Sequence, residues 1–327
     1  MFHELQIFEN PEAILLVASI IFFFSIIAGK AGFRFGLPAL LLFLGVGMLF
    51  SSDGLGIQFS NPSAAQFIGM LALSIILFSG GMDTKMSEIK PIATEGVVLA
   101  TVGVLLTTLI TGGFIYYVFL WSTGYETLTV AESMLMAAVM SSTDSASVFS
   151  ILRSKGVYLK QRLRPTLELE SGSNDPMAYM LTLLIIAYIQ VGGMNLQEAV
   201  LQLLVQLSVG AIAGFLLGKL AVLMINKINM DNESLSVSYT HLRAHESLYP
   251  ILLLTTAFFT FSATTLCKGN GYLAVYIAGL VVGNAKIVHK KSMGTFFDGF
   301  AWLWQIVMFL TLGLLVNPHE LLPVAPV

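Results

Sequence analysis

The chain has 327 residues, of which 56% are hydrophobic and 11% are charged, and its mean hydropathy is +0.83. Soluble domains carry roughly 25% charged residues, so this composition excludes a soluble globular protein and predicts a polytopic membrane protein. The net charge of −3 excludes a basic surface for nucleic acid, and the single cysteine, Cys267, excludes a disulfide framework or a CxxC metal site.

Ten apolar segments are candidates for membrane-crossing helices, because a helix needs about 20 apolar residues to span the hydrocarbon core. We therefore expect an all-α membrane protein with about ten transmembrane helices. In chain order, the predicted spans cover residues 12–29, 37–51, 64–81, 94–120, 131–151, 166–191, 198–225, 249–267, 271–285 and 299–317.

The basic residues alternate from loop to loop. Lysine and arginine gather in the loops that follow the first, third, fifth, seventh and ninth predicted spans, and Lys268 is the exception. Cytoplasmic loops of membrane proteins carry an excess of these residues. The odd-numbered loops are therefore predicted to be cytoplasmic and the amino terminus to lie outside.

A segment of foreign composition interrupts the loop after the seventh predicted span. Residues 236–246 hold two of the five histidines. They follow one copy of Glu-Ser-Leu, at residues 233–235, and their last residue begins a second copy, at residues 246–248. Removal of residues 236–248 restores a short polar loop, and residues 237–246 resemble the translation of a transposase adapter used in sequencing libraries. We expect a non-native insertion; the alternative is a metal pair formed by His241 and His245, four residues apart on a helix.

The strongest indication of function is a polar run in an apolar segment, from Glu170 to Pro176 with the sequence Glu-Ser-Gly-Ser-Asn-Asp-Pro. A charged side chain near the bilayer centre costs about 2.5–3.5 kcal/mol, so its default interpretation is functional. On a helix, residues 170, 171, 174 and 175 share one face and can project into one cavity. Asp175 is the predicted titrating group, because a carboxylate in such a site binds either a proton or a cation.

The neighbours of Asp175 have supporting roles in this hypothesis. Asn174 supplies a donor and an acceptor without charge, and Glu170, one turn earlier, is expected to hold its amide. The alternatives are that Glu170 caps a helix start at the cytoplasmic edge and that Asp175 is paired for structure only. Pro176 removes a backbone donor, which predicts a local irregularity in the helix.

A second polar run, Ser-Ser-Thr-Asp-Ser-Ala-Ser at residues 141–147, falls in the middle of the predicted span 131–151. Hydroxyl and Asx side chains compete with helical hydrogen bonds, and unwound backbone at membrane depth is tolerated only where it lines a cavity or is buried in protein. We therefore predict a broken helix at Thr143 and Asp144, whose carbonyls and half-helix ends are available as ion ligands. The alternative, that Asp144 caps the second half-helix, is compatible with cation coordination.

Together these stretches resemble the NhaP-type branch of the monovalent cation:proton antiporters. The resemblance covers the whole chain except residues 236–246. It implies a fold of inverted repeats in which two broken helices cross at the midplane. The segments that carry it are residues 80–84 (Gly-Gly-Met-Asp-Thr), 142–144, 170–176, 297–302 (Phe-Asp-Gly-Phe-Ala-Trp) and 314–318 (Leu-Leu-Val-Asn-Pro).

The resemblance also implies roles for individual residues. Asp175 matches the transporting aspartate, Asn174 its neutral partner, and Glu170 the acid that holds the asparagine. An Asn-Asp pair in place of two aspartates goes with electroneutral, one-for-one exchange, and members of the family are usually homodimers. The other positions matched to the ion site are Ser171, Thr143 and Asp144.

The chain departs from the family pattern at its carboxyl end. The family's last helices, including the second broken helix, and a cytoplasmic regulatory domain have no counterpart in the sequence. Residues 1–327 are therefore expected to form a partial membrane transport domain.

We predict a secondary active transporter, not an enzyme, that exchanges Na⁺ or K⁺ for protons in the bacterial inner membrane without a cofactor. Its expected partners are the monovalent cation, the proton, the lipid bilayer and a second copy of the chain. One alternative is a cation channel or a sodium-coupled symporter. The other is an intramembrane enzyme with Asp144 and Asp175 as acid and base, although the surrounding hydroxyls suit cation ligation better.

Overall fold

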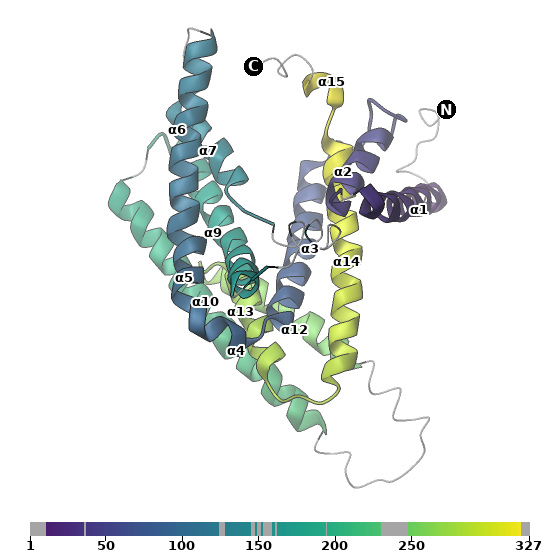
Figure 1. The fold of residues 1–327 in the computed structure, drawn as a ribbon, viewed down its shortest axis with the longest axis vertical. Helices are drawn as coiled ribbons and strands as arrows, with labels where there is room; N and C mark the ends of the chain where they lie inside the picture. The colour runs from purple at the N-terminus through teal and green to yellow at the C-terminus, as the bar shows by residue number, and fades with distance from the viewer. Residues whose placement is uncertain are drawn as a thin grey trace. The chain divides into compact units, whose positions relative to one another are not determined.

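The computed structural model describes residues 11–35, 37–123, 128–144, 148, 152, 159–160, 162–193, 195–229 and 248–321. The regular elements within these ranges are all helical, as predicted (Figure 1). The insertion predicted at residues 236–246 lies outside them. The elements are α1 (Pro11–Phe35), α2 (Ala39–Phe50), α3 (Pro62–Asp83), α4 (Met86–Ile89), η1 (Lys90–Ile92), α5 (Ala93–Val98), η2 (Leu99–Gly103), α6 (Val104–Thr123), α7 (Val130–Met140), α9 (Leu163–Val191), α10 (Leu196–Asn229), α12 (Leu248–Leu266), α13 (Gly271–Asn284), α14 (Lys290–Leu315) and α15 (Pro318–Leu321).

Helical structure is present in each of the ten predicted spans. Within the described part of the chain, six helical stretches are long and apolar enough to cross a membrane by length and composition. Helices α2, α7 and α13 are shorter apolar helices. Helix α9 has 29 residues but is not among the six, because the polar residues in its first half lower its hydropathy.

Two predicted boundaries need correction, and one predicted interruption is confirmed. The helical segment of the predicted span 94–120 begins earlier, at Met86, and includes the 3₁₀ turn η1 at Pro91 before the predicted start. The π-helical turn η2 lies within the predicted span, directly before α6. The last span begins at Lys290 rather than at residue 299. The span 131–151 is interrupted, since α7 ends at Met140 and residues 141–144 are not helical. Counting apolar residues misses helical turns that are polar, whereas the interruption was predicted from its hydroxyl-rich sequence.

The chain forms two compact units, whose boundaries fall inside α3 and α14. The first unit comprises Met1–Leu73, Ser145–Leu159 and Phe300–Val327. Within it, α2 and α14 meet at two glycines: a Cβ on Gly47 would lie 2.8 Å from the Cα of Gly313. The same helices are joined beyond their ends, where the Ser52 hydroxyl donates to Asn317 Oδ1 at 2.7 Å.

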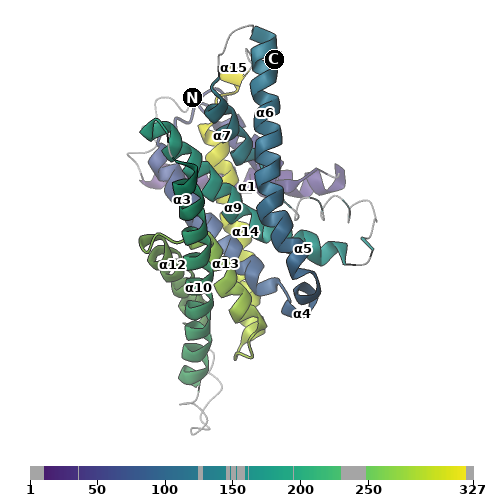
Figure 2. The ribbon, with the colours of Figure 1, turned by 90° about the vertical axis from the view of Figure 1, so that its left-hand side faces the viewer.

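The second unit, Ser74–Asp144 with Lys160–Gly299, is built around α13. Helix α13 lies beside α10, with a hypothetical Cβ on Gly214 only 2.4 Å from the Ala274 carbonyl oxygen (Figure 2). On another side, a Cβ on Gly279 would lie 2.3 Å from the Phe78 carbonyl oxygen of α3. Glycine permits such close approach of membrane helices. The core between them includes Phe78, Ile225, Leu253, Val275, Val282 and Phe297.

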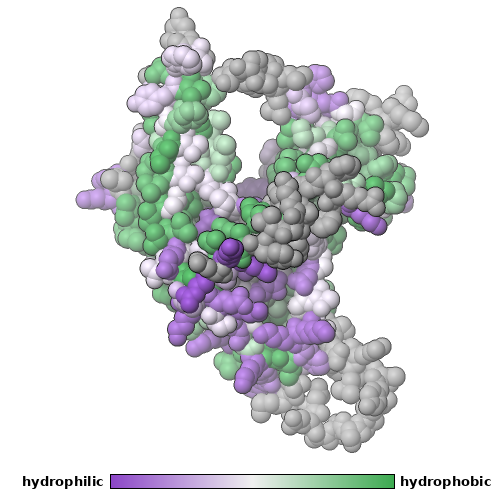
Figure 3. Space-filling view, in the orientation of Figure 1, coloured by the Kyte–Doolittle hydropathy of each residue, from purple (hydrophilic) through white to green (hydrophobic). Residues whose placement is uncertain are grey.

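The surface of the described residues is apolar over long stretches of helix. Ile110, Phe114 and Trp121 of α6 have exposed fractions of 70%, 68% and 88%. Figure 3 shows hydrophobic residues along the region of α6 and hydrophilic residues gathered near α4. Exposed apolar surface of this extent is typical of helices that face lipid, as expected for a multi-pass membrane protein.

The glycine contact between α3 and α13 leads to a stability prediction. In Gly81→Ala the new methyl group would lie 2.3 Å from the Tyr276 carbonyl oxygen and force the helices apart. We expect a loss of about 1–3 kcal/mol of unfolding free energy, as for other overpacked sites. The neighbouring Gly80→Ala is the matched control, because no atom lies within 4 Å of its Cβ. Thermal unfolding of the detergent-solubilised variants tests this; equal midpoints for the two would contradict the contact.

Candidate functional site

Helices α7 and α9 contact each other and bring the two polar runs together. A capping box fixes the start of α7: Thr129 Oγ1 accepts from the Glu132 amide at 3.2 Å, and Glu132 Oε2 accepts from the Thr129 amide at 2.8 Å. At the other end, the Ser141 hydroxyl donates to the Ala138 carbonyl at 2.7 Å, which competes with a continuing helix. The chain therefore leaves the helix at residues 141–144, where Ser142 and Thr143 form hydrogen bonds with residues of α9.

Thr143 joins the break to three residues of α9. Its Oγ1 donates to the Glu170 carboxylate, with 2.8 Å to Oε2 and 2.9 Å to Oε1, and accepts from Asn174 Nδ2 at 2.6 Å. Its carbonyl accepts from the Ser171 hydroxyl at 2.9 Å. The structure thus places these four predicted site residues in one hydrogen-bonded network.

Glu170 holds the amide of Asn174, as the sequence predicts. Asn174 Nδ2 donates to Glu170 Oε1 at 2.9 Å, and the asparagine side chain is fully buried. The alternative role of Glu170 as a helix cap is wrong, because α9 begins two turns earlier, at Leu163. With its NH₂ group donating to Glu170 and Thr143, Asn174 directs its Oδ1 toward the break, where Ser142 Oγ lies 3.3 Å away.

Asp175 lies next to this network on α9. Its Oδ1 accepts a hydrogen bond from the Ser142 hydroxyl, and the charges of Asp144 and Glu170 act on it. Asp144 itself is exposed at the end of the described part of the break. Repulsion among neighbouring carboxylates is relieved when a proton or a cation binds.

Ser142 is a site residue that the sequence analysis did not assign. Its hydroxyl is within hydrogen-bonding distance of both Asn174 and Asp175, so it bridges the pair. The sequence feature that could have indicated Ser142 is its position directly before Thr143 in the same hydroxyl-rich run. Which of the several hydroxyls in that run faces α9 depends on the turn that the backbone makes after Met140.

The irregularity predicted at Pro176 is absent from the backbone, since α9 continues as one α-helix from Leu163 to Val191. Proline has no amide hydrogen, so the Gly172 carbonyl one turn earlier loses its helical donor. The ring of Tyr276 occupies the space beside that turn, and a Cβ on Gly172 would lie 2.7 Å from its Cε2 atom. The helix α9 is therefore continuous at a turn against which Tyr276 of α13 packs.

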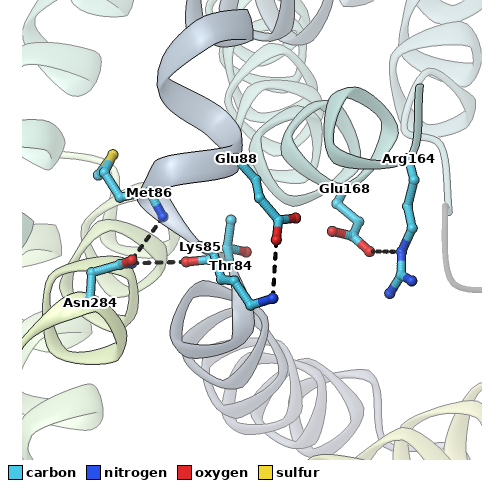
Figure 4. A network of polar contacts seen from close by, with 7 residues as sticks. All are labelled: Thr84, Lys85, Met86, Glu88, Arg164, Glu168 and Asn284. Atoms are coloured by element: carbon cyan, nitrogen blue, oxygen red, sulfur yellow. Dashed lines mark hydrogen bonds and ion pairs between the residues drawn. The ribbon is translucent and has the colours of Figure 1, made fainter. Parts of the chain in front are cut away.

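A separate polar network lies at the first turns of α9, where α3, α4 and α13 also end or begin (Figure 4). Arg164 pairs with Glu168 at 2.9 Å, and the Asn284 side chain accepts from the Met86 amide at 2.7 Å and donates to the Thr84 carbonyl at 2.8 Å. Exposed ion pairs contribute at most about 1 kcal/mol, so the pair of Glu168 anchors the helix end only weakly. Glu168 therefore belongs to this peripheral network rather than to the site around Asp175.

The site offers oxygen atoms as ligands. They come from carboxylates and from hydroxyl and carbonyl groups of the break, a set that suits hard cations rather than soft metals. Among the residues that the structure describes, no group of three or more histidine, cysteine, aspartate or glutamate side chains could hold a metal ion.

Comparison with known proteins found relatives that match over most of the chain. The chain is 39% identical over 315 residues to the K(+)/H(+) antiporter NhaP of Alkalimonas amylolytica, covering 96% of this chain and 51% of that protein. It is 26% identical over 306 residues to Probable Na(+)/H(+) antiporter 2 of Methanocaldococcus jannaschii, covering 90% and 67%. The chain spans about half the length of NhaP and of the similar NhaP2 proteins of Shewanella.

The fold is also that of a solved structure. The sodium proton antiporter MjNhaP1 of Methanocaldococcus jannaschii superposes with a TM-score of 0.74 over 94% of this chain and 71% of that one, at 23% identity. Finally, the family model described as "Sodium/hydrogen exchanger, transmembrane" matches residues 13–326. The chain therefore belongs to the transmembrane sodium/hydrogen exchanger family, and it is of the NhaP type that its two polar runs indicate.

Proposed function

We propose that the protein exchanges Na⁺ or K⁺ for protons across the membrane, one for one, and that Asp175 binds the cation and the proton in turn. Membership of the exchanger family supports a secondary transporter rather than an enzyme. The relatives named above are K(+)/H(+) and Na(+)/H(+) antiporters. Because the chain spans about half of NhaP, the activity of the whole protein is part of the proposal.

The observation that carries the proposal is the junction between α9 and the break after α7. Asp175 accepts from Ser142 and lies within the electrostatic reach of Asp144 and Glu170. Its carboxylate is therefore more stable when a proton or a cation neutralises part of this charge, and the two compete for the same oxygen atoms. Competition at one group couples the two fluxes without a second gate.

The neutrality of Asn174 supports one-for-one exchange. Its NH₂ group donates to Glu170 and to Thr143, which fix the amide. Within the Asn-Asp pair, only Asp175 changes its charge. We assign Glu170 to holding Asn174, and the remaining residues of the ion site are Ser171, Thr143 and Asp144.

We also propose an orientation and a location. The basic side chains of Lys85 and Arg164 lie at the same end of the second unit, together with the end of α13 (Figure 4). This grouping supports a cytoplasmic position for that end, with the amino terminus outside and the protein in the inner membrane of a bacterial cell. By analogy with the family resemblance we propose a homodimer, which light scattering of the purified protein in detergent would test.

The proposal is tested with the full-length protein in proteoliposomes that carry a pH-sensitive dye. A pulse of NaCl or KCl should move protons in proportion to the cation, and a membrane potential should leave the rate unchanged. Cation uptake that follows the membrane potential and moves no protons would indicate a channel. Solute uptake driven by the cation would indicate a symporter. Comparing Na⁺ with K⁺ in the same vesicles identifies the preferred ion.

A second arm of this experiment addresses residues 236–246. The repeated Glu-Ser-Leu on either side supports the proposal that this segment is foreign to the transport domain. Removal of residues 236–248 should then leave the exchange rate within about twofold, a change of about 0.4 kcal/mol in the barrier. Loss of exchange on removal would show that the segment belongs to the transporter.

A further inference from the structure

Asn270 joins three helices at a buried point close to the proposed ion site. It is the N-cap of α13: its Oδ1 accepts from the Leu273 amide at 2.9 Å. Its backbone amide donates to the Gln206 carbonyl of α10 at 3.0 Å, and only 4% of the residue is exposed. A Cβ on Gly210 would lie 2.8 Å from the Asn270 carbonyl oxygen, so α10 approaches here without an intervening side chain. The position of Asn270 is therefore fixed from two sides.

The remaining polar atom of Asn270 reaches α9. Its Nδ2 donates to the carbonyl of Pro176 at 2.9 Å, in a buried hydrogen bond between residues 94 positions apart. Pro176 directly follows Asp175, so this bond holds the peptide group next to the proposed transporting carboxylate. The donor that Pro176 cannot supply is missing at the Gly172 carbonyl, one turn earlier, so the bond from Asn270 is an additional tie to the same stretch of α9 and not a replacement for the missing one.

Aromatic contacts extend the same junction by one turn. The ring centroid of Tyr272 on α13 lies 4.7 Å from that of Tyr179 on α9, and the two rings are edge to face. It lies 4.8 Å from the ring centroid of Phe261 on α12. These rings fix the distance between α9 and α13 through apolar contact, whereas Asn270 fixes the backbone by a directional bond. The two kinds of contact can therefore be separated by mutation.

We propose that Asn270 is a positioning residue for ion exchange: through the carbonyl of Pro176 it sets the orientation of Asp175 relative to the break after α7. This inference rests on the proposed role of Asp175. The two side-chain atoms of Asn270 then have different tasks, since Oδ1 caps α13 and Nδ2 holds α9. Loss of the second task alone should change how Asp175 binds its ligands and leave α13 intact.

Asn270→Ser separates these tasks in the full-length protein. Serine caps a helix about as well as asparagine does, but it has no amide to offer to Pro176. We expect the apparent KM for the cation to rise by about two- to tenfold, the range of one hydrogen bond, with a shifted pH of half-maximal exchange and a nearly unchanged maximal rate. Asn61→Ser is the matched control, because Asn61 caps α3 through the Ala64 amide at 3.0 Å and belongs to the first unit.

Hydrogen exchange of the α9 amides supplies a readout that does not depend on transport. In Asn270→Ser, amides in the turn after Pro176 should exchange faster than in the wild type, while those at the start of α13 should not. Wild-type KM and pH profile in Asn270→Ser, with a loss confined to Asn270→Ala, would mean that only the cap matters and would overturn the proposal. Unchanged exchange of the α9 amides would also overturn it. A failure of the proposed function would be recognised separately, because Asp175→Asn would then still exchange cations for protons.

Discussion

Replacing Asp175 with asparagine should abolish cation-dependent proton movement while the protein still folds. Asparagine keeps the size of the side chain and an oxygen that can accept from Ser142, but it cannot bind and release a proton. Since exchange requires both bound states, we expect a loss of about 100-fold or more, which corresponds to about 2.7 kcal/mol in the barrier. Proteoliposomes with a pH-sensitive dye measure this loss directly.

The matched control for this variant is Asp53→Asn. Asp53 is also an aspartate that accepts a hydrogen bond, from the His319 amide at 3.0 Å, but it belongs to the first unit and not to the site. Its replacement should leave exchange unchanged. If Asp175→Asn kept half or more of the wild-type rate, another group would carry the proton and the assignment would be wrong.

Replacing Asn174 with aspartate should damage both stability and transport. The amide that donates to Glu170 Oε1 at 2.9 Å would become a carboxylate facing another carboxylate, in a position that is fully buried. An uncompensated buried charge costs about 3–5 kcal/mol, so we expect a large fall in the thermal midpoint at neutral pH. Lowering the pH should restore part of the stability, because a protonated carboxyl group can again donate to Glu170.

The double variant Asn174→Asp with Glu170→Gln tests whether this contact is the cause. It exchanges the amide and the carboxylate between the two positions, so that the new glutamine amide can donate to the new aspartate carboxylate. The midpoint should recover by more than half of the loss. Asn226→Asp serves as control, because it removes a comparable donor, to the Lys286 carbonyl at 3.2 Å, at an exposed site. A double variant as unstable as Asn174→Asp alone would show that Glu170 does not hold Asn174.

The class of the protein, the helical segments and the two polar runs could be predicted from the amino-acid sequence alone. These features can be predicted because the bilayer imposes a free-energy cost on each segment that crosses it. Crossing helices must be long and apolar, and charged or hydroxyl-rich residues inside them are costly unless they serve a function or line a cavity. The interruption after Met140 could be predicted from the residues at 141–147, and the contact of Glu170 with Asn174 from their spacing of one helical turn. Both are properties of neighbouring residues in the chain.

Features set by polar residues were harder to predict. The helical turns from Met86 to Ala93 and the start of α14 at Lys290 are amphipathic or polar, and apolar counting passes over them. The continuity of α9 through Pro176 was also missed, because the sequence does not reveal what surrounds the turn with the missing donor. In the structure, Tyr276 of α13 packs beside that turn, and Asn270 donates to the Pro176 carbonyl one turn later.

Which distant groups contact Asp175 and Pro176 depends on how the helices pack. Ser142 and Asp175 are 33 residues apart, and Asn270 and Pro176 are 94 apart. No periodicity links such positions, since their distance depends on how closely α7, α10 and α13 approach α9. Glycines contribute to this packing, because Gly210 and Gly214 let the backbone of α10 touch that of the α13 region, and α13 in turn contacts α9. Local patterns therefore identify the chemical groups of the site, while helix packing determines which of them act on one another.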